Sequence, residues 1–250
     1  MAETRLKAVV LAAGKGTRLR IGDTDAPKVM RQARGKPLLS YVLDSLAFIG
    51  KADTIIVVGY GRDAVSGFFP GYAYAVQEKQ LGTGHAVMAA SGMLSGYDGP
   101  VLVCYGDMPA VRRETYEALV SEHVESKNAC TILTGESSLP LPYGRVLRDV
   151  DGAFLHVVED RDCTPEQKKI TELNSGVYVF NSPRLLEALL DLKSDNTQGE
   201  YYLTDVPAIL GARNLRVGLH KRDLGDEIIG VNTAEQLAQV EEILRKREIM

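Results

Sequence analysis

The chain has 250 residues, 45% of them hydrophobic and 25% charged, which is typical of a globular protein with a sizeable buried core. With 29 Lys and Arg against 33 Asp and Glu, its formal net charge of −4 excludes a chain-wide positive field for a nucleic-acid backbone. No stretch approaches the roughly 18 to 20 apolar residues of a membrane span, and charges near Met1 interrupt any secretory signal. We therefore predict no nucleic-acid partner and no membrane anchor.

The three cysteines also constrain where the protein works. They lie at Cys104, Cys130 and Cys163, an odd number at wide spacing that fits neither a disulfide framework nor a clustered zinc site. This usage predicts reduced thiols and a cytoplasmic protein.

Short runs rich in Val and Ile alternate with helix-like segments along the chain. The predicted strands are residues 8–13, 54–59, 72–76, 101–105 and 130–134. The predicted helices are residues 37–49, 84–94, 112–125 and 182–190. Strands without polar alternation are typical of sheets covered on both faces, so the pattern predicts an α/β fold with a mostly parallel sheet flanked by helices.

Two later segments break this alternation. Residues 144–159 contain two strand-like runs about Asp151-Gly152, which predicts a β-hairpin inserted into the α/β order. Residues 233–250 carry apolar positions at helical spacing and predict a terminal helix. No repeat or linker-like tract divides the chain, so we expect one domain over residues 1–250.

A glycine-rich loop follows the first predicted strand. It places Gly14, Gly16 and Arg18 close together, and glycines let backbone N–H groups approach a phosphate that an arginine can clamp. The P-loop pattern is absent, and Leu19 stands where a dinucleotide motif needs its third glycine. A tight turn with solvated Lys15 and Arg18 remains the alternative for this loop.

Further motifs follow in order along the chain. They are Pro27-Lys28-Val29-Met30, Gly35-Lys36-Pro37-Leu38-Leu39, Gln77-Glu78-Lys79-Gln80-Leu81-Gly82-Thr83-Gly84-His85-Ala86, Tyr105-Gly106-Asp107-Met108-Pro109, Tyr143-Gly144-Arg145, Glu172-Leu173-Asn174-Ser175-Gly176-Val177-Tyr178, Gly199-Glu200-Tyr201-Tyr202-Leu203-Thr204-Asp205 and Gly230-Val231-Asn232. Together they resemble the nucleotide-sugar pyrophosphorylases over about residues 5 to 235. The resemblance is greatest to the N-terminal uridyltransferase half of the bacterial bifunctional members that make UDP-N-acetylglucosamine.

The resemblance implies a Rossmann-like, mostly parallel sheet with an added sugar-binding lobe, the nucleotide-diphospho-sugar transferase fold. It divides the predicted domain into a mainly nucleotide-binding part at about residues 1–135, a mainly sugar-binding part at about 136–232, and the terminal helix at 233–250. It also implies a Mg²⁺-dependent transfer of a uridylyl group from UTP to N-acetylglucosamine 1-phosphate, releasing pyrophosphate.

Site residues are implied in the same way. Arg18 and Lys28 are the catalytic cations, and Asp107 and Asn232 are the Mg²⁺ ligands. The nucleotide is contacted by Leu11, Ala12, Ala13, Gly14, Lys15, Gln77, Gly82, Thr83, Tyr105, Gly106 and Asp107. The sugar is contacted by Gly144, Glu159, Asn174 and Thr204.

This chemistry suits the residue types. A phosphate oxygen that attacks the α-phosphorus of UTP needs no general base, so positioning and charge neutralisation supply most of the catalysis. Asp107 follows a predicted strand, where ligands bind at the carboxyl edge of open α/β sheets. Its carboxylate and the Asn232 amide offer the hard oxygens that Mg²⁺ prefers.

Each assignment also has a simpler structural alternative. Asp107 can end a strand in a turn, and Lys28 and Arg18 can be surface cations. Asn232 can cap the terminal helix. Glu159 can be a solvated charge, and Asn174 a buried residue bonded only to backbone. For His85, within a predicted helix, we expect a packing or hydrogen-bonding role rather than a catalytic base.

The chain also departs from the family. Residues 19–26 form a longer and more acidic stretch than is usual before the Pro-Lys pair, which affects the placement of Lys28. No hexapeptide repeat is present, so we expect neither a left-handed β-helix, nor acetyltransferase activity, nor a trimer built on that helix. Alternatives for function are another sugar-1-phosphate nucleotidyltransferase, using dTTP or UTP with glucose or another amino sugar, and a non-catalytic sugar-nucleotide sensor.

Overall fold

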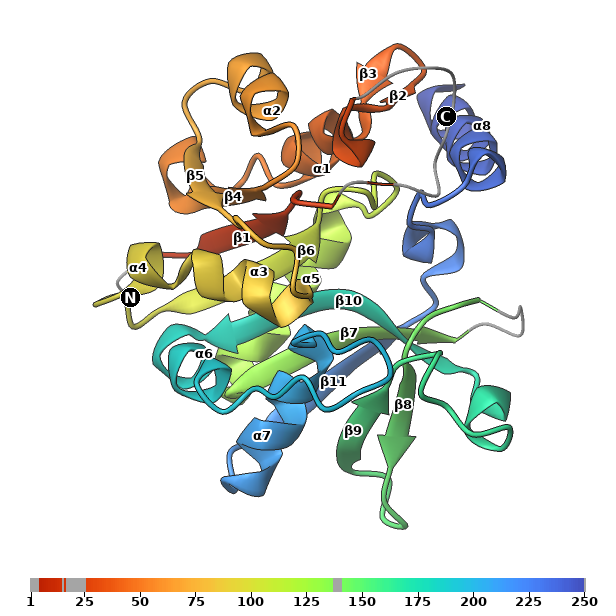
Figure 1. Ribbon diagram of the computed structural model, residues 1–250. Coiled ribbons are helices and arrows are strands. Elements are labelled where there is room, and N and C mark those ends of the chain that lie inside the picture. The colour runs from red at the N-terminus through yellow and green to blue at the C-terminus, as the bar shows by residue number, and fades with distance from the viewer. Residues whose placement is uncertain (1–4, 15, 17–25, 137–140, 250) are drawn as a thin grey trace.

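A computed structural model describes residues 5–14, 16, 26–136 and 141–249, with side chains as far as Arg247 (Figure 1). Its strands are β1 (Lys7–Leu11), β2 (Gln32–Ala33), β3 (Lys36–Pro37), β4 (Thr54–Val58), β5 (Ala73–Val76), β6 (Pro100–Tyr105), β7 (Cys130–Glu136), β8 (Arg145–Arg148), β9 (Phe154–Val158), β10 (Glu172–Asn181) and β11 (Val217–Arg222). Its α-helices are α1 (Leu38–Ser45), α2 (Arg62–Phe68), α3 (Thr83–Ala89), α4 (Ser91–Leu94), α5 (Arg113–Ser126), α6 (Ser182–Leu189), α7 (Val206–Ala212) and α8 (Ala234–Ile249).

The central sheet has the strand order β11-β7-β10-β6-β1-β4-β5. Neighbouring strands are parallel except around β10, which is antiparallel to both β6 and β7. The predicted mostly parallel α/β sheet is therefore confirmed. Because β1, β4 and β6 are parallel, their carboxyl ends lie at one edge of the sheet, where ligands bind in open α/β folds.

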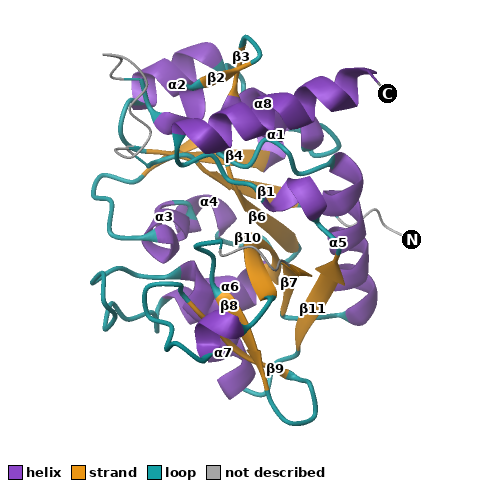
Figure 2. Cartoon of the chain, turned by 90° about the vertical axis from the view of Figure 1, so that its right-hand side faces the viewer, coloured by secondary structure: helices purple, strands orange, loops and turns teal. Residues whose placement is uncertain are grey.

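Helices cover both faces of this sheet (Figure 2). In β1, Ala8 and Val10 belong to one hydrophobic cluster with α1, α5 and α8, whereas Val9 and Leu11 belong to a second cluster with α3, α6 and α7. Successive strand residues point to opposite faces, so a strand buried on both sides has no polar positions. This explains the continuous apolar runs in the sequence.

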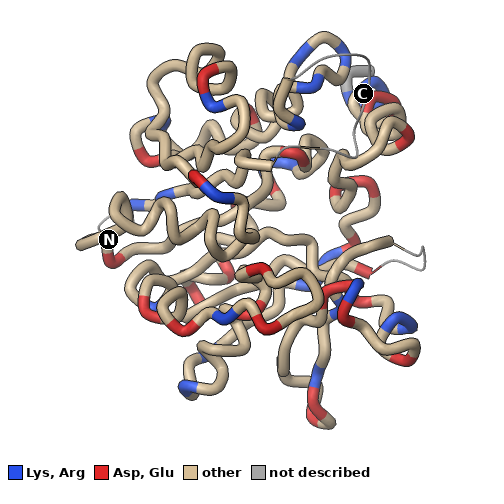
Figure 3. The backbone as a smooth tube through the Cα atoms, viewed as in Figure 1, with Lys and Arg blue, Asp and Glu red and all other residues tan. Residues whose placement is uncertain are grey.

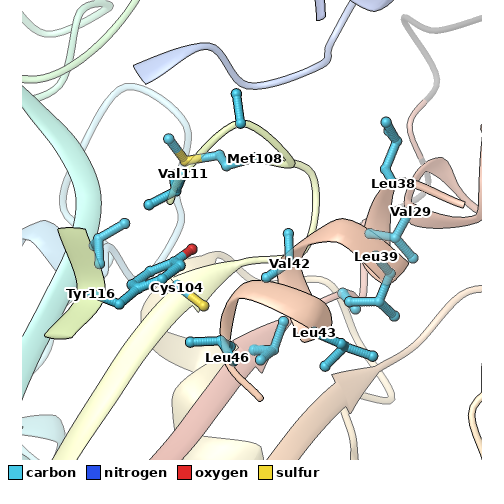
Figure 4. Close-up of a cluster of buried hydrophobic side chains, with 14 of the residues drawn as sticks. Val29, Leu38, Leu39, Val42, Leu43, Leu46, Cys104, Met108, Val111 and Tyr116 are labelled. Carbon is cyan, nitrogen blue, oxygen red and sulfur yellow. The ribbon is translucent and has the colours of Figure 1, made fainter. Parts of the chain in front are cut away.

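The first cluster packs α1 against the end of β6 and the start of α5 (Figure 4). Leu39, Val42 and Leu43 lie on the buried side of α1, and Tyr116 of α5 lies beside Cys104 of β6. Burying side chains of this size contributes roughly 1.5 to 3 kcal/mol each to the hydrophobic free energy of folding. The packing fixes the turn after β6 in position.

Strand β10 joins the central sheet to the predicted hairpin. Its register with β7 shifts between Asn174 and Tyr178, and Leu173 pairs with Arg145 of β8. The β8–β9 hairpin confirms the prediction for residues 144–159, with Asp149 Oδ1 accepting hydrogen bonds from the backbone of Asp151 and Ala153. Since β10 is antiparallel to β6, its first residues lie at the same edge as the end of β6.

The other predicted strands agree with β1, β4, β5, β6 and β7 to within a few residues, and α8 confirms the terminal helix. The predicted helix over residues 84–94 is instead split into α3 and α4 at Ala90. Strands β10 and β11 and helices α2 and α7 were not predicted. No helix in the described part of the chain is both long and apolar enough to cross a membrane.

Candidate functional site

The loops at the carboxyl edge of the sheet surround a cavity of about 420 Å³. It lies where the turns after β1 and β6, the start of α3, the first residues of β10 and the loop before α8 meet. Most of the predicted site residues line it: Leu11, Ala12, Ala13, Gly14, Lys28, Gln77, Gly82, Thr83, Tyr105, Asp107, Gly144, Glu159, Asn174 and Asn232. Residues separated by more than two hundred positions therefore share one cavity.

Four predicted site residues are not among those that line it. Lys15 and Arg18 lie outside the described residues. Gly106 packs below the cavity, where its N–H donates to Leu11 O at 2.9 Å and an added Cβ would crowd Leu39 and Val29. Thr204 lies behind Glu159, to which its hydroxyl donates at 2.9 Å.

The glycine-rich loop enters the cavity at Gly14. An added Cβ at Gly14 would have no atom within 4 Å, so packing alone does not require glycine there. Gly16 differs, because its φ of +65° and the nearby Cβ of Lys28 both favour glycine. The loop thus leaves open space at Gly14 and packs closely against Lys28 at Gly16.

Lys28, Asp107 and Asn232 form a cluster at the cavity wall. The Lys28 ammonium makes an ion pair with Asp107 Oδ2 and donates a hydrogen bond of 3.0 Å to Asn232 Oδ1. The side chains of Lys28 and Asp107 are 16% and 13% exposed, so this is no surface pair. The alternative that Lys28 is an ordinary surface cation is therefore wrong.

The loop before α8 sets the position of Asn232. Thr233, not Asn232, caps α8: Gln236 N–H donates to Thr233 Oγ1 at 3.3 Å, and Gln236 Oε1 accepts from Thr233 N–H at 3.1 Å. Val231 N–H donates to Asp107 O at 2.9 Å and ties this loop to the turn after β6. The capping alternative is thus wrong, and the Asn232 amide oxygen faces Lys28.

A second group of residues lies between the end of β5 and the start of α3. Gln77 is 4% exposed, and its amide donates to Gly82 O at 3.0 Å. Gly82 has a φ of +108°, and an added Cβ would come within 2.6 Å of Tyr201 O, so only glycine fits this turn. The Thr83 hydroxyl accepts from Leu203 N–H at 2.9 Å.

The opposite wall is formed by the hairpin and β10. Asn174 Oδ1 accepts from Gly176 N–H at 3.1 Å, and Asn174 Nδ2 donates to Tyr178 Oη at 2.6 Å. Asn174 is therefore held by a side chain as well as by backbone, contrary to the alternative in which only backbone binds it. An added Cβ at Gly176, with its φ of +82°, would strike the Tyr105 ring.

Glu159 lies at the end of the hairpin and faces the same cavity. Burial raises the pKa of Glu159, with Asp205, Asp162 and Asp160 adding to the rise and the Thr204 hydroxyl opposing it. The alternative of a solvated hairpin charge is therefore wrong. A carboxylate with one hydrogen bond from Thr204 retains acceptor capacity for a ligand hydroxyl or amide.

Several lining residues were not assigned from the sequence: Gln80, Tyr143, Ser175, Gly176, Glu200 and Gly230. All lie in the motifs that carry the family resemblance, so position within a motif was the available signal. Tyr143 stands out because its hydroxyl accepts from Gly230 N–H at 2.9 Å, two residues before Asn232. It connects the hairpin wall to the loop that carries Asn232.

The residues at the Lys28 cluster suit a divalent cation. Asp107 and Asn232 direct hard oxygens at one ammonium, so a positive charge already occupies the place between them. Among the described residues, no three His, Cys, Asp or Glu side chains form a metal-binding group. A metal there would have two protein ligands and draw the remainder from phosphates and water, as Mg²⁺ at phosphate sites does.

Charges of both signs are interspersed along the described chain (Figure 3). Near the hairpin end of the cavity, Asp160 pairs with Arg145 at 3.2 Å, and Glu172 pairs with Arg148 at 2.7 Å. These carboxylates already have cationic partners. Glu159, whose hydrogen bond comes from a neutral hydroxyl, is the acidic group of this wall that faces the cavity.

Known proteins match the chain in sequence. The model of the MobA-like NTP transferase domain matches residues 8–206. The chain is 41% identical over 241 residues to the bifunctional protein GlmU of Streptococcus suis, covering 96% of this chain and 52% of that protein. It is 42% identical over 249 residues to GlmU of Syntrophotalea carbinolica, covering 99% of this chain and 53% of that protein. The chain thus spans about half the length of the curated relatives it matches.

A solved structure shows the same fold. It is a protein of Bacillus anthracis named as a glucose-1-phosphate thymidylyltransferase, and it superposes with a TM-score of 0.77 at 19% identity. The match covers 96% of this chain and 95% of that one. The predicted nucleotide-diphospho-sugar transferase fold is confirmed, and the extent of the family match shows that the chain belongs to the MobA-like NTP transferase domain family.

Proposed function

We propose that the protein transfers a uridylyl group from UTP to N-acetylglucosamine 1-phosphate, giving UDP-N-acetylglucosamine and pyrophosphate. The observation that supports this most is the shared cavity, in which the Lys28 cluster lies with Gln77 and Gly82 and with the Asn174 and Glu159 wall. A single cavity with these two groups of polar residues suits a nucleotide and a sugar phosphate. The 41% identity to GlmU over nearly the whole chain agrees with this assignment.

In this proposal the two substrates occupy different walls. Gln77, Gly82 and Thr83 contact the uracil and ribose, while the backbone around Gly14, with Lys15 and Arg18, contacts the triphosphate. Gly144, Glu159 and Asn174 contact the amino sugar, whose hydroxyl and acetamide N–H groups can donate to the Glu159 carboxylate. Thr204 then positions Glu159 rather than touching the sugar.

The chain's own residues position the reacting groups. The sugar phosphate is itself the nucleophile, so no side chain has to remove a proton, and pyrophosphate leaves from the opposite side of the α-phosphorus. Lys28 lies on the same cavity wall as Asp107, and its ammonium neutralises negative charge on the phosphate oxygens. When bound by Asp107 and Asn232, Mg²⁺ supplies further neutralisation of the phosphates.

A panel of sugar 1-phosphates against UTP, dTTP, CTP and ATP, read by pyrophosphate formation with Mg²⁺, tests the proposal. We expect UTP with N-acetylglucosamine 1-phosphate to have the highest kcat/KM. A higher value with another pair would identify a different sugar-1-phosphate nucleotidyltransferase. Binding of UTP and sugar phosphate without Mg²⁺-dependent turnover would instead identify a sensor.

A further inference from the structure

The amide of Gln77 has a fixed direction in the cavity wall. Gln77 directly follows β5, and its backbone N–H extends the ladder to β4 by donating to Val58 O at 2.8 Å. Its side chain is 4% exposed and still lines the cavity. The backbone of Gln77 is therefore anchored, and the freedom that is left is the orientation of its side-chain amide.

Hydrogen-bond chemistry decides that orientation. The Gly82 carbonyl can only accept, so the atom 3.0 Å from it is the amide nitrogen of Gln77. The same nitrogen lies 3.1 Å from His85 Nδ1, which accepts when the ring proton is on Nε2. Both hydrogens of the amide are then used, and no described residue donates to Gln77 Oε1.

We propose that His85 is a positioning residue that sets which nucleotide base the cavity accepts. Together with the Gly82 carbonyl it accepts both N–H groups of the Gln77 amide, so that only the Gln77 Oε1 acceptor is left to face the cavity. This inference rests on the proposed function, which places the base at Gln77. A pyrimidine with a ring N–H, as in uracil, can donate to that acceptor. Cytosine carries a lone pair at the same ring position, so two acceptors would face each other.

His85 is well placed for this role. It lies outside the set of residues that line the cavity, behind Gln77, and its ring centroid is 6.4 Å from that of Tyr201. Its helix α3 is anchored next to it, because Gly84 N–H donates to Tyr201 O at 2.7 Å and an added Cβ at Gly84 would strike Leu192. The start of α3 is thus held in place, with the imidazole in contact with the Gln77 amide and outside the cavity lining.

Three substitutions on α3 test the proposal. His85→Leu removes the acceptor and leaves one buried N–H of Gln77 without a partner, which lowers the cost of turning that N–H toward the cavity. His85→Gln restores an acceptor oxygen. Met88→Leu alters a half-buried side chain of the same helix, away from the cavity lining, and controls for changes in packing.

The measurement is the ratio of UTP to CTP, taken as kcat/KM from pyrophosphate release and as Kd from calorimetry. We expect His85→Leu to lower the ratio by about tenfold, and His85→Gln and Met88→Leu to stay near the wild-type ratio. A general packing role would weaken both nucleotides equally. An unchanged ratio in His85→Leu would therefore overturn the proposal.

The two readouts separate this inference from the proposed function. If the wild-type protein binds UTP over CTP without turnover, and His85→Leu lowers that binding ratio, the role of His85 stands and the proposed reaction fails. If the wild-type protein turns over UTP and His85→Leu retains full discrimination in both readouts, the reaction stands and the role of His85 fails.

Discussion

Lys28 and Asn232 are 204 positions apart in sequence, yet the Lys28 ammonium donates a hydrogen bond of 3.0 Å to the amide oxygen of Asn232. The same ammonium is paired with Asp107. One cation therefore satisfies both oxygens that we propose for Mg²⁺. Two positive charges bound to the same two oxygens repel strongly, so a divalent ion that binds Asp107 and Asn232 must displace the Lys28 ammonium, which is then free to face the phosphates.

Lys28→Met should increase the affinity of the protein for a free divalent ion. The Asp107 carboxylate then lacks its counter-charge, and a metal can approach without displacing the ammonium. We expect about tenfold tighter Mn²⁺ binding in the absence of nucleotide, within the usual range of coupling between sites. Electron paramagnetic resonance of free Mn²⁺ measures this directly. The matched control is Lys79→Met, at an exposed lysine outside the cavity; equal Mn²⁺ affinity in both variants would contradict the expected competition.

Asp107→Asn should abolish metal-dependent turnover and leave the fold intact. The substitution keeps the shape of the side chain but removes the charge that balances a cation, and metal stabilisation of phosphoryl transfer is worth several kcal/mol. We expect at least about a hundredfold loss of kcat in pyrophosphate release, with a cooperative thermal transition retained. Asp151→Asn, in the exposed hairpin turn, is the control. Wild-type turnover in Asp107→Asn would remove this residue from the mechanism.

Tyr143→Phe should increase the Mg²⁺ concentration needed for half-maximal activity. The lost hydroxyl leaves Gly230 N–H without its 2.9 Å partner and loosens the loop that carries Asn232. A hydrogen bond of this kind is worth about 1 kcal/mol, so we expect a shift of about fivefold. Tyr74→Phe removes a comparable hydroxyl, bonded to Phe69 O, at the far edge of the sheet and should leave the Mg²⁺ requirement unchanged. A change in maximal rate with no shift in Mg²⁺ dependence would exclude the positioning role of Tyr143.

Glu159→Gln should alter how stability depends on pH. Burial raises the pKa of the Glu159 carboxyl above its ordinary value of 4.5. At pH values between 4.5 and this raised pKa, the folded protein therefore binds more protons than the unfolded chain. The free energy of unfolding must then fall as pH rises through this interval. Glutamine has no such proton. We expect the wild-type protein to lose stability relative to Glu159→Gln as pH rises from 4 toward neutrality, in urea unfolding curves. A difference that stays constant with pH would show that the carboxyl titrates alike in both states.

Sequence patterns were sufficient to predict those strands and turns whose structure depends on neighbouring residues alone. The strands β1, β4 and β6 were predicted because both of their faces are buried, which leaves uninterrupted Val and Ile. The hairpin was predicted from Asp151-Gly152, since glycine tolerates the left-handed backbone of that turn. By contrast, β10 was missed although all but its last residue are buried, because Asn174, Ser175 and Gly176 interrupt its apolar pattern. Those residues belong to the irregular segment that faces the cavity.

The sequence alone determined the alternation of strands and helices, because that alternation depends on residue types at short spacing. Its motifs also determined the family and most of the residues that line the cavity, through their resemblance to the nucleotide-sugar pyrophosphorylases. Only the tertiary structure decided that Thr204 lies behind Glu159 and that Lys28 is paired between Asp107 and Asn232. The first depends on the hairpin that pairs with β10, and the second on the return of the chain to the turn after β6 just before α8. Such long-range contacts arise from packing of the whole chain, and no local pattern specifies them.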